Sequence, residues 1–253
     1  MTSAGAAAAL PAAAAASRKG IVQLGFFRLR NSADGQAQRV SDYLKSTLLP
    51  AFQRNGIEPA GFFRNLMGGG EGPFVMVLTP FPSLAGMEAA QEKLVADKEF
   101  LKGLEAFNAQ PGLSYMRMET SLLRGFDSMP SIEVPPTDAK RPGRIFEVRT
   151  YESNNLSTLR RKMKMFDDGE IGIFRRVGMQ PVFFGETIVG RNMPNLTYML
   201  GYDDLAHRDK TWRAFGSDPE WQKLRALPGL SDAEVVSNIT NFLVSPLPFS
   251  PIR

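Results

Sequence analysis

The pattern of apolar and polar positions between residues 145 and 244 switches between the period of a strand and that of a helix. Residues 145–151 alternate as a strand does. Apolar side chains then recur at helical spacing from Leu156 to Val177, and Gly178 follows where a helix end favours a left-handed residue. The same criteria predict strands at residues 182–189, 196–202 and 235–244, with a helix before the last. The predicted order is therefore strand, helix, strand, strand, helix, strand.

Four short segments of the first half of the chain recur in the same order in the second half. The separation between matching residues stays between 117 and 122. The pairs are 27–30 with 146–149, 52–59 with 174–181, 97–100 with 218–221, and 111–114 with 228–231, the last pair being identical (PGLS). Four matches in one order indicate a tandem duplication.

The duplicated unit predicts an α+β fold of two tandem ferredoxin-like (βαββαβ) domains. Each antiparallel sheet would carry helices on one face only, and its bare apolar face must be covered. Two linked copies can cover each other, sheet against sheet, so we expect a dimeric α+β barrel formed as an intramolecular pseudo-dimer. Homo-oligomerisation through sheet edges or a basic helix is a further option.

Composition shifts set the predicted boundaries. Three prolines between residues 130 and 136 favour an extended linker between the halves. The predicted divisions are an Ala-rich tail or signal remnant (1–19), a first, divergent domain (20–126), a Pro-rich linker (127–143), a second domain (144–246) and a C-terminal tail (247–253).

The alanine-rich start bears on localisation. Residues 6–16 are alanine except for Leu10 and Pro11, and Arg18 and Lys19 follow. An export signal begins with basic residues before its apolar stretch, and residues 1–3 include none. The remainder resembles the tail of a bacterial export signal, so we expect a periplasmic or secreted protein, with a cytoplasmic one as the alternative.

Composition also narrows the classes of site. The chain has no cysteine, which excludes disulfides and thiolate chemistry. Its 30 basic and 26 acidic residues are interspersed, which does not favour nucleic acid as a partner, and no apolar run suits a transmembrane segment. The only histidine, His207, falls off the apolar stripe of its predicted helix and should face solvent. No cofactor and no metal are predicted.

Local charge patterns are expected to be structural. Arg160, Arg161 and Lys162, with Lys164, would form a solvated basic helix face. Asp203 or Asp204 can cap the helix that follows, and Asp218 can cap the next one, with proline at its first position.

A polar group stands out on the first strand of the second half. Glu147, Arg149 and Tyr151 occupy alternate positions and therefore share one face. Phe146 and Val148 would face the helices, which would place the polar trio inside the barrel.

Three residues on other predicted strands are expected to join this trio. Glu186 would pair with Arg149, and Tyr198 and Asn241 would close the group. The candidate ligand-binding residues are Glu147, Arg149, Tyr151, Glu186, Tyr198 and Asn241. The alternative is an internal salt-bridge network that holds the two sheets together.

The stretch from residue 146 to residue 246 resembles the NIPSNAP family of dimeric α+β barrel proteins. The segments that carry the resemblance are 146–151 (FEVRTY), 174–178 (FRRVG), 181–186 (PVFFGE), 193–199 (MPNLTYM), 218–221 (DPEW) and 237–241 (SNITN). The first half matches more loosely, mainly at Arg30, Arg54, Gly56, Pro59 and the acidic residue followed by an aromatic one near Phe100. The resemblance implies a bacterial protein with two tandem domains, and it supplies no agreed catalytic residues.

Together these patterns predict a NIPSNAP-type protein of undefined activity that binds a small ligand or serves as an interaction protein. Relatives on the same barrel include cofactor-free monooxygenases and isomerases. The alternative is therefore a cofactor-independent monooxygenase or isomerase-like enzyme acting on a small hydrophobic or aromatic metabolite. In that case Tyr151, Arg149 and Glu186 would polarise or deprotonate the substrate.

Overall fold

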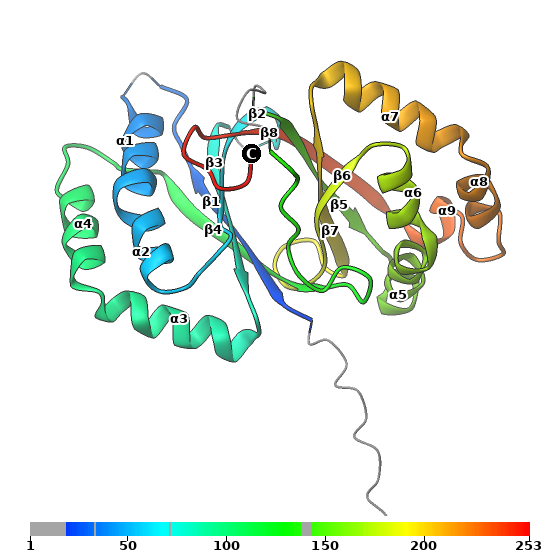
Figure 1. The fold of residues 1–253 in the computed structure, drawn as a ribbon, viewed down its shortest axis with the longest axis horizontal. Coiled ribbons are helices and arrows are strands. Elements are labelled where there is room, and N and C mark those ends of the chain that lie inside the picture. Colours follow the sequence, from blue (N-terminus) through cyan, green and yellow to red (C-terminus); the bar gives the residue numbers. More distant parts are fainter. Residues whose placement is uncertain (1–18, 33, 71, 138–142) are drawn as a thin grey trace, which may run out of the picture.

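The computed structural model describes residues 19–32, 34–70, 72–137 and 143–253. Within them, eight strands close into one antiparallel barrel in the order β1-β3-β2-β8-β5-β7-β6-β4. The helices of the two halves lie on opposite sides of the barrel (Figure 1). All but one residue of the predicted N-terminal tail lie outside the described residues.

The first half follows the predicted order, with the helical segments divided into several pieces. Its elements are β1 (Ile21–Arg28), α1 (Gln36–Tyr43), the π-helix η1 (Leu44–Leu48), α2 (Leu49–Arg54), β2 (Gly61–Gly68), β3 (Phe74–Phe81), α3 (Leu84–Ala96), α4 (Lys98–Asn108) and β4 (Arg117–Gly125).

The second half repeats this order and adds one short helix, α9, before its last strand. Its elements are β5 (Ile145–Glu152), α5 (Leu156–Met165), the π-helix η2 (Phe166–Glu170), α6 (Ile171–Arg176), β6 (Gln180–Val189), β7 (Asn195–Tyr202), α7 (Leu205–Ser217), α8 (Pro219–Arg225), α9 (Asp232–Val235) and β8 (Asn238–Pro246).

Matching details in the two halves support the duplication. Arg54 contacts Asp97, the N-cap of α4, and Arg176 contacts Asp218, the N-cap of α8; both Nη2 to Oδ2 distances are 2.8 Å. In both halves the helical segment between the first and second strands contains a π-helical stretch at the same place, η1 in the first half and η2 in the second. The repeated unit therefore includes its caps and its helix irregularity.

Two strand pairs join the halves and close the barrel. β2 pairs with β8, and β4 pairs with β6, so each seam joins the second strand of one half to the fourth strand of the other. Apolar side chains from both halves fill the interior, and those that are buried there are Val22, Leu24, Phe63, Phe74, Met76, Leu78, Leu123, Phe146, Val148, Val182, Phe183, Met199, Val244 and Ile252. The prediction of a pseudo-dimeric barrel within one chain is confirmed.

The segments outside the two repeated units also contact the barrel. In the predicted linker, the carbonyl of Pro130 accepts a hydrogen bond from Gly20 N, and Glu133 N donates to the carbonyl of Val182. At the C-terminus, Ser250 Oγ accepts from Phe62 N at 2.9 Å. Residues 138–142 of the predicted linker lie outside the described residues.

None of the helices in the described ranges is long and apolar enough to cross a membrane.

Candidate functional site

The strand β5 presents its side chains to the sides opposite to those predicted. Phe146 and Val148 are buried inside the barrel. Tyr151 packs instead in the cluster between the sheet and the helices of the second half, and Glu147 bonds to side chains of α7. The prediction that the polar trio lines the barrel interior is therefore wrong. Both faces of β5 are buried, one by the barrel interior and one by the helices. The apolar residues Phe146 and Val148 therefore do not indicate which face of the strand meets the helices.

Glu147 is the centre of a buried polar network on this outer face. Arg208 of α7 donates from Nε and Nη2 to its two carboxylate oxygens, at 2.9 and 2.7 Å. The remaining donors are Arg149 Nη1 (2.8 Å), Asn241 Nδ2 (2.6 Å), Trp212 Nε1 (3.1 Å) and Tyr202 Oη (3.5 Å). A carboxylate with this many donors has little capacity left for a ligand.

The network keeps Glu147 ionised. Burial pushes the pKa of Glu147 upward, but the hydrogen bond from Arg208 and the charges of Arg149 and Arg208 outweigh it, so that the pKa lies below its usual range. The two cations and one anion therefore form a charged group beneath α7, where breaking one partner would be costly.

Two tyrosines extend the network along the sheet. Arg149 Nη2 donates to Tyr151 Oη at 3.3 Å, and Tyr198 Oη donates to the same oxygen at 2.9 Å. The Arg149 guanidinium also lies 4.6 Å from the centre of the Trp212 ring. Five of the six predicted site residues thus come together, and their polar atoms are directed at one another. Ligand binding by this group stays a prediction.

Glu186 does not join the other five residues. In the sheet register it lies opposite Arg124 of β4 and Leu196 of β7. Among the described side chains, no hydrogen bond or ion pair links it to Arg149, which binds Glu147 instead. The acid–base set expected for an enzyme, Tyr151 with Arg149 and Glu186, is therefore not assembled.

Lys162 is buried, so the prediction that it belongs to a solvated basic helix face is wrong. Its side chain is only 1% exposed, and Nζ lies 3.1 Å from Glu170 Oε2 and 3.4 Å from Asp232 Oδ1. Nζ also lies 4.9 Å from the Phe166 ring centre and 5.2 Å from that of Trp221. Burial works to lower the pKa of Lys162, but the Glu170 and Asp232 carboxylates outweigh it and raise that pKa. The sequence carried a signal: Lys162 follows Leu159 by three positions and precedes Phe166 by four, which places it on the apolar stripe.

The capping predictions for the second half are confirmed, and His207 lies close to one of these caps. Asp204 caps α7 by accepting from His207 N at 2.7 Å. The His207 side chain is 26% exposed, and its Nδ1 accepts a hydrogen bond from Asp203 N at 3.2 Å. No group of three or more His, Asp or Glu side chains in the described ranges is placed to hold a metal ion.

A cavity of about 590 Å³ opens at one mouth of the barrel, on the face of β5 opposite to the network. Its apolar wall comes mainly from the first half: Phe26 and Phe74 meet edge to face at 5.4 Å, and Phe242 of β8 lies 5.2 Å from Phe74. Leu24 and Val148 complete this wall. A volume of this size lies within the ordinary range for small-molecule pockets.

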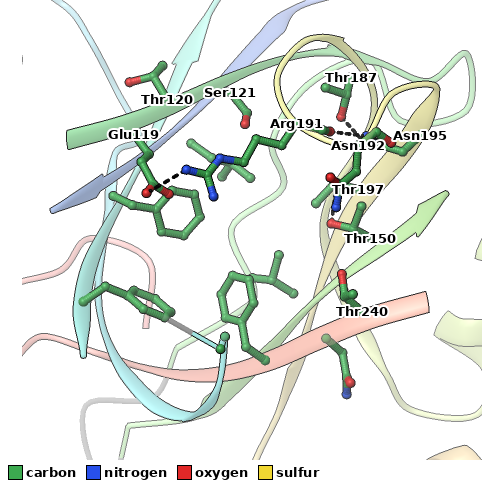
Figure 2. Close-up of a pocket in the computed structure, with 18 of the residues that line it drawn as sticks. Glu119, Thr120, Ser121, Thr150, Thr187, Arg191, Asn192, Asn195, Thr197 and Thr240 are labelled. Carbon is green, nitrogen blue, oxygen red and sulfur yellow. Dashed lines mark hydrogen bonds and ion pairs between the residues drawn. The ribbon is translucent and has the colours of Figure 1, made fainter. Parts of the chain in front are cut away.

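The opposite wall of the cavity is polar and comes mainly from the second half (Figure 2). The hydroxyls of Thr150 and Thr197 lie 2.8 Å apart, and Thr187 Oγ1 donates to Asn195 Oδ1 at 2.6 Å. Two further cavity residues, Ser121 and Thr240, make no side-chain hydrogen bond within the described part of the chain. Their hydroxyls are available to a bound molecule.

Charged residues gather on one carboxylate at the rim of the cavity. Glu119 Oε2 accepts from Arg28 Nε at 3.0 Å, and Oε1 accepts from Arg117 Nε at 2.7 Å and Arg191 Nη2 at 3.1 Å. Figure 2 shows Arg191 reaching from the β6–β7 turn to Glu119 on β4. Burial works to raise the pKa of Glu119, but the hydrogen bonds from Arg117 and Arg28 outweigh it and lower that pKa.

Of the described residues that line this cavity, Asn241 alone was among the predicted site residues, and its amide binds Glu147. Thr150 alternates with Phe146 and Val148 on β5, so the signal was present once the faces of that strand are assigned correctly. The rim combines residues 28, 119 and 191, which are more than 70 positions apart, and no local pattern indicates that they meet.

The fold and the cavity define the class of the protein. Two ferredoxin-like units that close one barrel, with helices outside, form the dimeric α+β barrel architecture within one chain. The NIPSNAP family model matches residues 146–251, which make up most of the second half of the chain.

Solved structures extend the fold similarity to the whole chain. A candidate monooxygenase from Fusobacterium nucleatum is 9% identical, with 91% of this chain and 93% of that chain covered at a TM-score of 0.60. A second candidate monooxygenase, from Lactobacillus acidophilus, is 10% identical over 90% and 94% of the chains at a TM-score of 0.55. A NIPSNAP-like protein from Burkholderia xenovorans is 24% identical and covers 43% of this chain and 90% of its own, at a TM-score of 0.38. Among curated proteins none matches the sequence. The similarity is one of fold.

Proposed function

We propose that the protein binds a small, partly apolar molecule in the cavity at the mouth of the barrel. The observation that carries this proposal is the composition of the two walls: three phenyl rings face a row of threonines, and the hydroxyls of Ser121 and Thr240 make no hydrogen bond to any other described side chain. Such a site places an apolar body against the rings and a polar end against hydroxyls.

The buried network around Glu147 supports this location indirectly. Its polar atoms are used in contacts between β5, β8 and α7, and these contacts hold the helices on the sheet. The cavity lies on the other face of the same strand and draws on both halves of the chain. Duplication followed by divergence therefore supplies a site with one apolar and one polar wall.

The test uses a cavity-filling substitution with a matched neighbour. Thr240 lines the cavity, whereas the adjacent Ile239 points to the other side of β8 and is 41% exposed. Binding of the fluorescent probes 2-naphthylmethanol and 2-naphthoate would be titrated with Thr240→Trp and with Ile239→Trp. We expect Thr240→Trp to abolish binding and Ile239→Trp to retain it.

A third variant separates the cavity from the network. Tyr198→Phe removes one hydroxyl of the outer group and leaves the cavity lining unchanged. Loss of binding in Tyr198→Phe but not in Thr240→Trp would move the site to the outer network. The proposal would be contradicted if the unmodified protein bound neither 2-naphthylmethanol nor 2-naphthoate.

A further inference from the structure

We propose that the mouth of the barrel that holds the cavity docks on an anionic lipid surface. In this arrangement Leu156 and Met193 enter the apolar zone of the lipids, and Arg160 meets their phosphates. The inference goes beyond ligand binding in the cavity and does not depend on it. It is carried by exposed apolar side chains on both sides of this mouth and by the exposed arginines beside two of them.

The sheet register defines the two mouths of the barrel. Because neighbouring strands are antiparallel, β1, β2, β5 and β6 end at the cavity mouth, and β3, β4, β7 and β8 begin there. The helix α5 follows β5 and therefore begins at the cavity mouth, whereas α7 follows β7 and begins at the opposite mouth.

Large apolar side chains are exposed at the cavity mouth in both halves of the chain. In the first half they are Met116 and Met118, around the start of β4, and in the second half they are Leu156, Met193 and Ile239. Met118 and Ile239 each occupy the second position of the fourth strand of their unit, so the duplication repeats this exposure. Exposed apolar side chains that gather in one region mark a contact surface.

Leu156 and Met193 lie together at the edge of this surface. Leu156 is the first residue of α5, and Met193 lies in the β6–β7 turn next to Asn192, which lines the cavity. The two apolar side chains are 58% and 49% exposed and line one open hollow with Pro194. They are therefore the apolar side chains best placed to enter a lipid layer.

Two exposed arginines follow these apolar side chains along α5. Arg160 comes four positions after Leu156, so the two side chains are neighbours on one face of the helix. Arg160 makes no hydrogen bond or ion pair with any other described residue, and Arg161 donates to the uncharged carbonyl of Gly229 at 2.7 Å. Glu152, four positions before Leu156, is half-buried and accepts hydrogen bonds from two asparagine amides. The exposed charge beside Leu156 is thus positive and complements anionic headgroups.

The cavity favours lipid over a folded partner at this surface. A specific protein interface has a closely packed core. Here the exposed apolar side chains lie on both sides of an opening into a cavity of about 590 Å³, which a folded partner would leave unfilled at the centre of the contact. A fluid lipid layer requires no such shape complementarity, and methionine side chains adapt readily to it.

Leu156 has a matched control at the opposite mouth. Leu205 is also the first residue of a helix, follows a side chain that caps that helix, and is 46% exposed. An aspartate in the first turn of a helix is stabilised by the helix dipole, so Leu156→Asp and Leu205→Asp should both fold.

Binding would be measured by co-sedimentation with vesicles of equal parts phosphatidylcholine and phosphatidylglycerol. We expect Leu156→Asp to lower the partition coefficient at least about tenfold and Leu205→Asp to change it less than about twofold, since only Leu156 is buried in lipid. The affinity for 2-naphthylmethanol should be unchanged in Leu156→Asp, because Leu156 does not line the cavity. This separates the inference from the proposed function.

A second substitution tests the contact with the headgroups. Arg160→Gln should lower binding to the anionic vesicles about fivefold, as the loss of one cation beside an anionic surface does, and leave binding to pure phosphatidylcholine vesicles unchanged. Equal effects of Leu156→Asp and Leu205→Asp, or no binding of the unmodified protein to the anionic vesicles, would overturn the inference. Light scattering tests the other occupant: a dimer of the full chain that Leu156→Asp dissociates would place a second copy on this surface and would also overturn it.

Discussion

Arg208 on α7 and Glu147 on β5 form a two-pronged ion pair, with Nε and Nη2 at 2.9 and 2.7 Å from the two carboxylate oxygens. The Glu147 side chain is completely buried, whereas that of Arg208 is 22% exposed. This geometry fixes α7 over the outer face of the barrel, and it leaves Arg149 and Trp212 dependent on the same carboxylate. The pair therefore anchors α7 to the sheet in the second half of the chain.

Removing the charge of Glu147 should destabilise the fold strongly. In Glu147→Gln, two arginines lose their buried counter-charge and the new amide cannot accept from every donor, so we expect a loss of about 3–5 kcal/mol in the free energy of unfolding. Urea titration followed by circular dichroism would measure it. Glu186→Gln is the matched control on the same sheet, and its effect should stay within about 0.5 kcal/mol. A loss below about 1 kcal/mol in Glu147→Gln would show that the network is dispensable.

The same substitution should change how stability depends on pH. Because the folded-state pKa of Glu147 lies below its unfolded value, its stabilisation is complete above the unfolded pKa of about 4.3 and is lost as the pH falls through the folded-state pKa. The stability difference between the unmodified protein and Glu147→Gln should therefore be constant near neutral pH and shrink in acid. A difference that is unchanged down to pH of about 3 would contradict this assignment.

The buried pair of Lys162 and Glu170 should respond differently to single and double substitution. Both side chains are at most 2% exposed, so Lys162→Met leaves Glu170 without its counter-charge and should cost about 3–5 kcal/mol. Asp232, the other partner, is 44% exposed and remains hydrated. The double variant Lys162→Met with Glu170→Leu should recover most of the loss, because an apolar pair of similar volume suits this aromatic surrounding. Equal losses in the single and double variants, measured by urea unfolding, would refute a charge-pair role.

The fold was predictable because several independent patterns agreed. The order of strands and helices followed from hydrophobic period, and the duplication followed from segments such as 52–59 and 174–181. Barrel closure followed from the bare apolar faces that two such sheets must cover. The extra helix α9 was missed, because Val235 reads as the start of a β-branched run although β8 begins at Asn238.

The site was less predictable because it depends on strand faces and on distant partners. Aligning residue 27 with residue 146 suggested that Arg30 corresponds to Arg149. In the structure Phe27 packs under the helices, whereas Phe146 lies inside the barrel. The alignment of the two first strands is therefore off by an odd number of residues, which places each side chain on the wrong face of its strand. Arg30 lies beyond β1, is half exposed and pairs with Asp34. A strand with both faces buried does not reveal in its own sequence which face meets the helices.

The isolated second half should form a homodimer. Both seams of the barrel join the second strand of one unit to the fourth strand of the other, β2 with β8 and β6 with β4. A fragment of residues 144–246 would expose the edges of β6 and β8 and the apolar inner face that includes Phe146 and Met199. Two copies can rebuild both seams by pairing β6 of one with β8 of the other.

Light scattering during size-exclusion chromatography would give the mass of this fragment. We expect twice the fragment mass, and a melting temperature that rises with concentration, since dimerisation is coupled to folding. Burial of an inner face of standard interface size, about 800 Å² per partner, provides the driving force. The full chain is the control: its two halves are already joined, so closure of its barrel is intramolecular and its melting temperature should not depend on concentration. A folded monomeric fragment would mean that each half covers its inner face without the other, and that barrel closure contributes little to the stability of the chain.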